Sequence, residues 1–215
     1  AKETLRPEPQ HLTISVTPTF ASKWLIPRLP DFTAVHPEID LRILATDRIA
    51  NFQTDAVDLA VRYGRPSFGP GLQADLLFEH IVVALGSPLL IDKLGKPETA
   101  DNLAAYALLH DAHNFWPQFL EHAMGRTAPV MAAKNIRFNQ TSLALEAAIG
   151  GQGLALASSF FIEEDIAAGR LMRLFETELR VGGDFYIVAP RKPRHAASVE
   201  AVRGWLLRES AKFKD

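Results

Sequence analysis

The chain contains no cysteine, which excludes disulfide bonds and thiolate chemistry and fits a reducing compartment. It has no apolar run approaching the roughly 20 residues of a membrane-spanning helix. Its start, AKETLRPEPQ, lacks the apolar core of a signal peptide. We therefore expect residues 1–11 to be a linker, and the protein to be cytoplasmic with no membrane partner.

Neither sign of charge is in large excess. The 215 residues include 23 Lys and Arg against 25 Asp and Glu, giving a net charge of -2, and neither end carries a long basic run. This chain alone therefore has no electrostatic footprint for nucleic acid. With 47% hydrophobic residues, the composition is ordinary for a globular protein and suits one large domain or two small ones.

Catalytic, cofactor and metal motifs are also lacking. No GxSxG elbow is present, and the glycines of 150–153 lack the spacing of a dinucleotide or nucleotide loop, so we expect no cofactor and no enzyme activity. His110 and His113 invite a metal interpretation, but no third ligand follows at a recognisable spacing. We interpret this segment as a polar loop at a strand end.

What the sequence does contain is a long first unit. Residues 12–16 and 41–45 read as strands because they alternate or are rich in β-branched residues, and a helix lies between them. The helix must stop at His36, because Pro37 disfavours a helical residue before it. Such a βαβ unit makes the strands parallel and places Thr17 at the carboxyl end of the first strand, where open α/β sheets bind ligands.

Pro27 complicates this helix, because proline inside a helix removes a hydrogen bond and clashes with the preceding turn. We expect a short first turn over residues 20–24 and a kink before the main segment. Thr17, Thr19 and Ser22 then face a ligand cleft or cap the helix, and both can hold, because a capping hydroxyl lies beside the free N–H groups that would receive a ligand. The free N–H groups at a helix start suit a small anion.

The rest of the chain reads as alternating strands and helices, an α/β pattern. Further strands are predicted at 55–64, 74–85, 107–110, 136–138, 154–157 and 185–189, and helices at 88–94, around 103, 116–124, 142–149, 160–168 and 198–212. Thr99 and Thr141 are predicted helix caps. Extended segments near 84–86 and 181–184 indicate two lobes around a cleft, with the last strand and helix rejoining the first lobe.

A series of runs carries a family resemblance: TPTFASKWLIPRLPDF, HPEIDLRI, DAVDLAVRYGRPSFGPGL, LGSPLL, EAAIGGQGLALASS and FYIVAP. In this order they closely resemble the effector-binding domain of LysR-type transcriptional regulators, in the branch with the glycine-cleavage and β-lactamase regulators. The resemblance covers 12–210. It implies two Rossmann-like subdomains, as in type 2 periplasmic binding proteins, with a small-molecule effector between them.

The resemblance also implies an organisation. Subdomain I is expected at 12–84 plus 184–215 and subdomain II at 85–183. A homodimer is implied, the full-length protein being able to form a tetramer, and DNA is contacted only through a winged helix-turn-helix absent from this chain. A periplasmic solute-binding protein is the alternative, and a small enzyme on the same frame is a third.

The resemblance further implies where an anionic effector binds. Thr17, Thr19 and Ser22 match the first effector loop, Thr141 and Ser142 the second-lobe helix start, and Tyr186 a strand residue whose ring faces the cleft.

Three further candidates come with alternatives. Arg62 pairs either with an effector anion or with Asp55 or Asp58. Trp116 either walls the cleft or belongs to the core, and His110 is the histidine expected to touch the effector.

Overall fold

The computed structural model describes residues 10–125 and 132–214. Contacts between Cα atoms divide the chain into two compact units. The described part of unit 1 comprises 10–21, Leu25–Glu79 and 183–214, and unit 2 comprises Ser22–Trp24 and His80–Gly182. The sequence placed the boundaries at 84/85 and 183/184.

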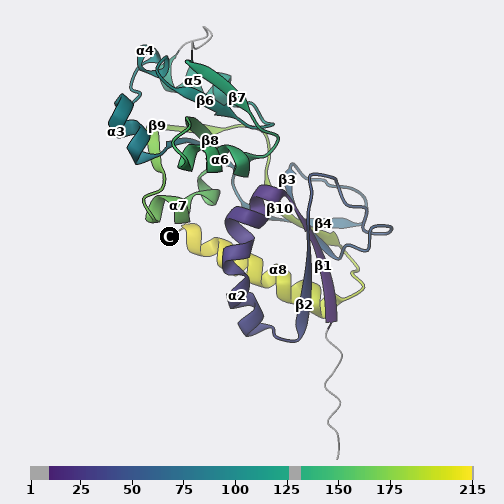
Figure 1. Cartoon of the computed structure of the whole chain (residues 1–215). Coiled ribbons are helices and arrows are strands. Elements are labelled where there is room, and N and C mark those ends of the chain that lie inside the picture. The colour runs from purple at the N-terminus through teal and green to yellow at the C-terminus, as the bar shows by residue number, and fades with distance from the viewer. Residues whose placement is uncertain (1–9, 126–131, 215) are drawn as a thin grey trace, which may run out of the picture. The chain divides into compact units, whose positions relative to one another are not determined.

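Unit 1 is built on a five-stranded mixed sheet. Its strands are β1 (Gln10–Val16), β2 (Ile39–Ala45), β3 (Leu59–Gly64), β4 (Leu72–Phe78) and β10 (Asp184–Pro190), in the order β2-β1-β3-β10-β4. β1 is parallel to β2 and β3, whereas β10 is antiparallel to β3 and β4 (Figure 1). The predicted parallel βαβ unit is therefore confirmed.

The crossover helix has an irregular start. It runs through α1 (Pro18–Phe20), the π-helical turn η1 (Ala21–Leu25) and α2 (Ile26–Val35), and it ends with His36 as its C-cap, as predicted. Pro27 is the second residue of α2, which directly follows the π-helical turn, so the missing N–H of the proline falls where the helical hydrogen-bond pattern changes. The predicted irregularity before Pro27 is thus a π turn.

Two helices of unit 1 lie side by side. Phe32 of α2 and Trp205 of α8 (Ala196–Ala211) are both buried, and their rings meet edge to face at 5.1 Å (Figure 1). Val199, Val202 and Leu206 are buried along the same helix, so the helix predicted at 198–212 packs through an apolar face. A short 3₁₀ helix, η3 (Lys212–Lys214), follows.

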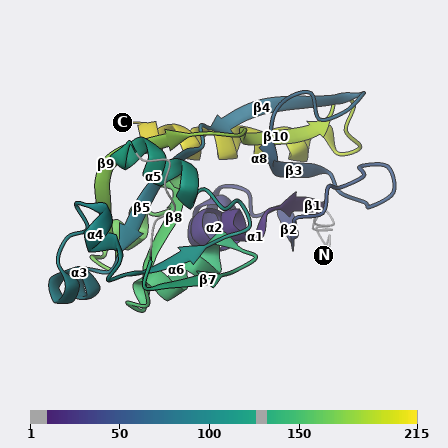
Figure 2. The same ribbon diagram turned by 90° about the horizontal axis from the view of Figure 1, so that it is seen from above.

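Unit 2 contains a second five-stranded mixed sheet, in the order β7-β6-β8-β5-β9. Its strands are β5 (Ile81–Gly86), β6 (Ala107–His110), β7 (Lys134–Arg137), β8 (Leu154–Ser158) and β9 (Met172–Arg180). Its helices are α3 (Pro88–Leu94), α4 (Ala100–Leu103), α5 (Trp116–Met124), α6 (Thr141–Ile149), η2 (Ser159–Phe161) and α7 (Glu163–Ala167). α5 packs on β9 and α6 on β8 (Figure 2).

Three residues of the first helical segment are packed into unit 2. The Trp24 ring stacks on Phe160 with ring centroids 5.3 Å apart. The Lys23 Nζ lies 2.8 Å from the Glu146 carboxylate and 3.4 Å from that of Asp165. This explains why Ser22–Trp24 groups with unit 2 although the helix on either side belongs to unit 1.

Several predicted elements are wrong in extent. The strand predicted at 74–85 is two strands, β4 and β5, which belong to different sheets and are separated by Glu79 and His80. The strand predicted at 55–64 begins only at Leu59, because residues 52–54 form a turn and Asp55 closes it by accepting the N–H of Asn51. The helix predicted at 160–168 is broken into η2 and α7, and β9 was not predicted.

No helix in the described part of the chain is both long and apolar enough to cross a membrane.

Candidate functional site

Four polar residues line up across the sheet of unit 1 at the carboxyl ends of its parallel strands. Val16 of β1 pairs with Ala45 of β2 and with Val61 of β3. The next residues along the three chain segments are Thr17, Thr46 and Arg62, so these three residues are neighbours. Tyr186 of β10 pairs directly with Arg62. Partnered residues on adjacent strands point to the same face of a sheet. We call Thr46, Thr17, Arg62 and Tyr186 the strand-end row.

Arg62 is the buried centre of this row, with 7% of its surface exposed. Its guanidinium donates to the Ser15 hydroxyl, to the Thr46 and Arg48 carbonyl oxygens at 3.0 Å each, and more weakly to the Val61 carbonyl oxygen. All four acceptors are neutral. Its Nε–H has no hydrogen-bond partner within residues 10–125 and 132–214.

Of the two alternatives for Arg62, the ion pair with Asp55 or Asp58 is wrong. Asp58 accepts the backbone N–H of Thr13 at 2.9 Å, and the Asp55 carboxylate lies 3.3 Å from Arg48. Burial lowers the pKa of the Arg62 guanidinium, and the more distant charge of Asp47 opposes that shift. A buried cation whose hydrogen bonds all go to neutral groups is a site that an anion would stabilise.

The hydroxyl of Thr17 is also available. Thr17 is the N-cap of the first helical turn, yet its side chain makes no capping hydrogen bond, so the capping interpretation does not hold for it. Its Oγ1 atom is buried without a hydrogen-bond partner in the described part of the chain. Tyr186 is half-buried and its ring lies 5.5 Å from that of Phe68.

The other first-loop candidates are placed differently. Thr19 is buried in α1, and Ser22 is exposed in η1 and groups with unit 2. The structure thus brings Thr17, Arg62 and Tyr186 together within one unit, and it adds Thr46, which the sequence reasoning missed. The register between β1 and β2, which pairs Val16 with Ala45, is the signal that could have identified Thr46.

In unit 2 the corresponding polar cluster is organised by a carboxylate. The Thr141 hydroxyl donates to Asp111 at 2.7 Å, and the other Asp111 oxygen accepts the N–H groups of His113 and Asn114. β6 and β7 are parallel, so residues after their carboxyl ends meet at one sheet edge. That signal could have placed Asp111 beside the start of α6.

The predicted capping role of Thr141 is wrong. α6 begins at Thr141 itself, its N-cap is Gln140, and the Thr141 hydroxyl is engaged by Asp111. Ser142, the second residue of the helix, is half-buried. Because Asp111 places a negative charge at this helix start, the site suits a hydrogen-bond donor better than the anion that the sequence suggests.

The remaining candidates are buried. The His110 ring nitrogens lie 3.1 Å from the Asn114 side-chain oxygen and 2.7 Å from that of Asn135. Trp116 is 2% exposed and its indole N–H donates to the Leu109 carbonyl oxygen, which places it in the core of unit 2. Within the described residues, no group of three or more His, Asp or Glu side chains could hold a metal ion.

Comparison with known proteins agrees with this architecture. The family model described as LysR substrate binding domain matches residues 6–211. The glycine cleavage system transcriptional activator of Escherichia coli K12 is 35% identical over 206 residues, 93% of this chain and 65% of its own length. The transcriptional activator AmpR of Pseudomonas aeruginosa is 32% identical over 200 residues, 93% of this chain and 66% of its own length. The chain therefore spans about two thirds of each relative.

Solved structures give the same picture. The effector domain of Pseudomonas aeruginosa AmpR is 31% identical, with a TM-score of 0.76 and coverage of 94% of this chain and 96% of that domain. The regulatory domain of Neisseria meningitidis CrgA, at 22% identity and a TM-score of 0.75 over 94% of this chain and 99% of that chain, shares the fold. The predicted two-subdomain α/β fold is confirmed.

Proposed function

Because the chain belongs to the LysR substrate-binding domain family, we propose that it senses a small anionic effector for a bacterial transcription regulator. Its relatives are named as transcriptional activators, which supports regulation rather than catalysis or solute transport. DNA contact in the whole protein is assigned to a winged helix-turn-helix outside this chain. The domain acts as a cytoplasmic homodimer.

The observation that carries the anionic chemistry is Arg62. Taking a charged group out of water costs several kcal/mol when no counter-charge compensates it. The protein supplies Arg62 with four neutral acceptors and leaves its Nε–H unsatisfied. A ligand carboxylate or phosphate at the strand-end row supplies both the missing charge and acceptors for the arginine and the Thr17 hydroxyl.

Regulation requires that the effector binds two conformations with different affinity. A coupling free energy of about 1 to 3 kcal/mol, or roughly 5- to 150-fold in affinity, is typical of such systems. We propose that binding at the strand-end row shifts the conformations of the dimer and so the spacing of its DNA-binding domains.

Native mass spectrometry of the purified chain tests this proposal. We expect a dimer that carries an additional small-molecule mass, which Arg62→Met abolishes. Arg42→Met is the matched control, because Arg42 is an exposed arginine on β2 of the same unit. A bare monomer at all working concentrations would contradict the dimer. A mass retained by Arg62→Met would remove Arg62 from the site, and a bare wild-type dimer would call for a screen of carboxylates and phosphates.

A further inference from the structure

A hollow of about 410 Å³ lies in unit 1 where three strand ends meet. β10 ends there at Pro190, β4 begins there at Leu72, and Asp58 directly precedes the first residue of β3. Because β10 is antiparallel to β3 and β4, these ends fall on one edge of the sheet. The volume lies in the range of small-molecule sites.

This hollow is separate from the strand-end row. Asp58, on its lining, precedes Arg62 by four residues along β3, which corresponds to about 13 Å of strand. Of the described residues that line the hollow, none belongs to the row. The inference that follows therefore does not depend on the proposed effector site.

The walls of the hollow are apolar and stiff. Phe52, Val57, Pro190 and Pro193 contribute ring and branched surfaces. Proline has no N–H and a fixed φ, so it offers a rigid face without hydrogen-bond donors. Such walls suit the apolar body of a small organic molecule.

Two of the three charged side chains in the described lining are cationic. Lys192 and Arg194 both line the hollow, and Arg194 donates to the Phe52 carbonyl oxygen at 3.2 Å, which holds its guanidinium at the rim. Asp58 is the one carboxylate among the described lining residues, and it already accepts the N–H of Thr13. Lys192 has no acidic partner within ion-pair distance in the described part of the chain.

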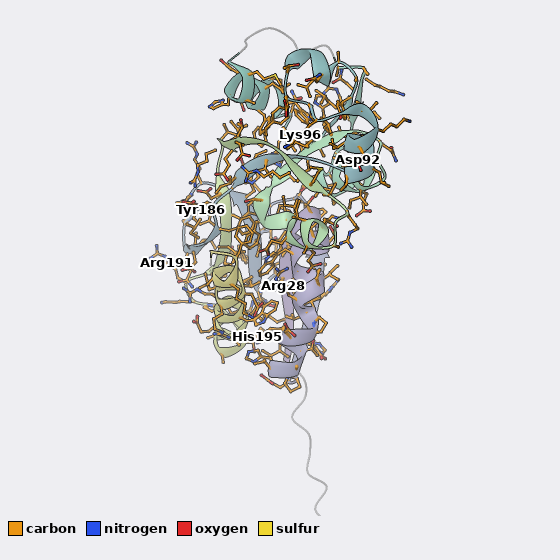
Figure 3. The ribbon with its side chains drawn as sticks, turned by 90° about the vertical axis from the view of Figure 1, so that its left-hand side faces the viewer. Arg28, Asp92, Lys96, Tyr186, Arg191 and His195 are labelled. Carbon is orange, nitrogen blue, oxygen red and sulfur yellow. The ribbon has the colours of Figure 1, made fainter. Side chains whose placement is uncertain are left out.

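The surrounding segment adds positive charge. Residues 191–195 read Arg-Lys-Pro-Arg-His in a chain whose net charge is -2. Arg191 projects away from the ribbon, and His195 lies at the start of α8 (Figure 3). α8 has no side-chain cap and no acidic residue in its first turn, so its free N–H groups contribute further partial positive charge.

We propose that this hollow binds a small organic anion, a carboxylate or phosphate attached to an aromatic or branched apolar group, as a second ligand site of the domain. Nucleic acid fits the geometry less well. Of the three cationic residues of 191–194, only Lys192 and Arg194 line the hollow, and Arg194 already donates to the Phe52 carbonyl oxygen at 3.2 Å, so few cations are available to a run of phosphates. A phosphate backbone would also leave the apolar walls unfilled.

Titration of the ¹⁵N-labelled chain with 2-naphthoate tests this site, with uncharged 2-naphthalenemethanol as the comparison probe. We expect saturable shifts of the amide signals of Phe52, Leu72 and Arg194 with naphthoate, and much weaker effects with the alcohol. Lys192→Gln with Arg194→Gln should weaken naphthoate binding about tenfold, the loss expected from two partly exposed ion pairs.

The matched control is Lys93→Gln with Arg42→Gln, which removes the same two charges from exposed positions on α3 and β2 and should leave the affinity unchanged. If the Lys192→Gln, Arg194→Gln variant did not fold, the affinity of the wild-type chain would be measured at low and high ionic strength instead. Raising the ionic strength from about 0.01 M to 1 M shortens the Debye length from about 30 Å to 3 Å and should weaken wild-type binding.

Four outcomes would overturn the proposal. They are no saturable binding at millimolar naphthoate, equal binding of the alcohol, shifts confined to Thr17 and Arg62, or equal effects of the two double variants. Binding of a random-sequence DNA duplex that only the Lys192 and Arg194 changes abolish, without naphthoate binding, would instead assign the segment to nucleic acid.

Discussion

Each unit buries a charged side chain, and the two are compensated in opposite ways. Asp165 of unit 2 is 4% exposed and lies 2.7 Å from the Arg170 guanidinium and 3.4 Å from Lys23. Arg62 of unit 1 is 7% exposed and is bonded to neutral oxygens alone. One charge is neutralised inside the protein, and the other is not.

The difference separates a structural role from a binding role. A buried ion pair completed by the protein holds elements together, here η1 against α7 and the residues after it. A buried charge completed only by neutral groups retains a desolvation cost that a ligand of opposite charge offsets. Four sets of substitutions test whether this contrast is correct.

The largest effect is expected from Asp165→Ala. It should lower the free energy of unfolding of unit 2 by about 3 kcal/mol, because breaking a buried ion pair leaves its partners uncompensated. Urea unfolding followed by tryptophan fluorescence in a Trp205→Phe background reports unit 2, where Trp24 and Trp116 lie. Asp92→Ala, at an exposed carboxylate on α3, is the control. An equal effect of both changes would break the comparison.

Arg62→Met should cost less, about 1 kcal/mol in unit 1, because recovery of the desolvation cost offsets most of the lost hydrogen bonds. Arg62→Lys should cost more than Arg62→Met, since it keeps the buried charge but loses the fork that reaches several oxygens. Urea unfolding followed by the amide NMR signals of β1 and β3 measures both. If Arg62→Met lowered the free energy of unfolding more than Arg62→Lys, the charge itself would stabilise the unliganded unit.

The two threonine hydroxyls give a smaller version of the same contrast. Thr141→Val removes the donor to Asp111 and should destabilise unit 2 by about 1 to 2 kcal/mol, because a carboxylate oxygen loses its partner. Thr17→Val removes a hydroxyl that has no partner and should change the stability of unit 1 by less than about 0.5 kcal/mol. Thermal unfolding of both variants provides the measurement. Equal destabilisation would mean that Thr17 is already satisfied.

A small, pH-dependent effect is expected at Asp75, where Arg203 donates two hydrogen bonds of 2.7 Å from α8 to β4. These bonds lower the pKa of Asp75 below its ordinary value of 3.8. A lowered folded-state pKa gives stability that is present above the unfolded pKa and is lost as the pH falls through the folded one.

Asp75→Asn should therefore reduce the fall in the free energy of unfolding of unit 1 that occurs as the pH drops below about 4. The reduction should be roughly 1 kcal/mol or less for this partly exposed pair. Denaturant titrations at pH 6 and at acid pH, with Asp92→Asn as the control, measure the change in slope. If the free energy of unfolding fell equally with pH in the variant and the wild type, the ion pair would contribute no net stability.

Much of the fold follows from local sequence signals. β1 alternates along its length, Pro37 terminates α2, and Ser87 caps α3 through the N–H of Leu90. The Thr99 hydroxyl likewise accepts the N–H of Asn102 and caps α4, as predicted. Each of these signals acts within a few residues, so one sequence suffices to find it.

The errors arose where two strands or two registers follow one another without a clear break. β4 and β5 are both apolar and only Glu79 and His80 separate them, so the change of sheet is invisible in the pattern. In β9 the pairing with β5 shifts register, and Phe175 adopts a φ of +62°, so the alternation slips inside the strand. A period-two search misses such a strand.

Three of the four residues of the strand-end row could be proposed from the sequence, but their arrangement could not. Thr17 follows from the carboxyl end of a parallel strand, whereas the pairing of Arg62 with Tyr186 depends on the register of β10, which no local pattern determines. The neutral hydrogen bonding of Arg62 was hidden as well, because Asp55 and Asp58 lie closer in sequence than Thr46 and Arg48, whose carbonyl oxygens it contacts.

The position of β10 also bears on how the chain is made. β3 and β4 are consecutive along the chain but each pairs with β10, so β4 has no partner strand until residues 184–190 are synthesised. Pairings that distant slow folding and leave strand edges exposed in the meantime. A nascent or truncated chain that stops before β10 would therefore present two open edges, a form in which aggregation competes with folding.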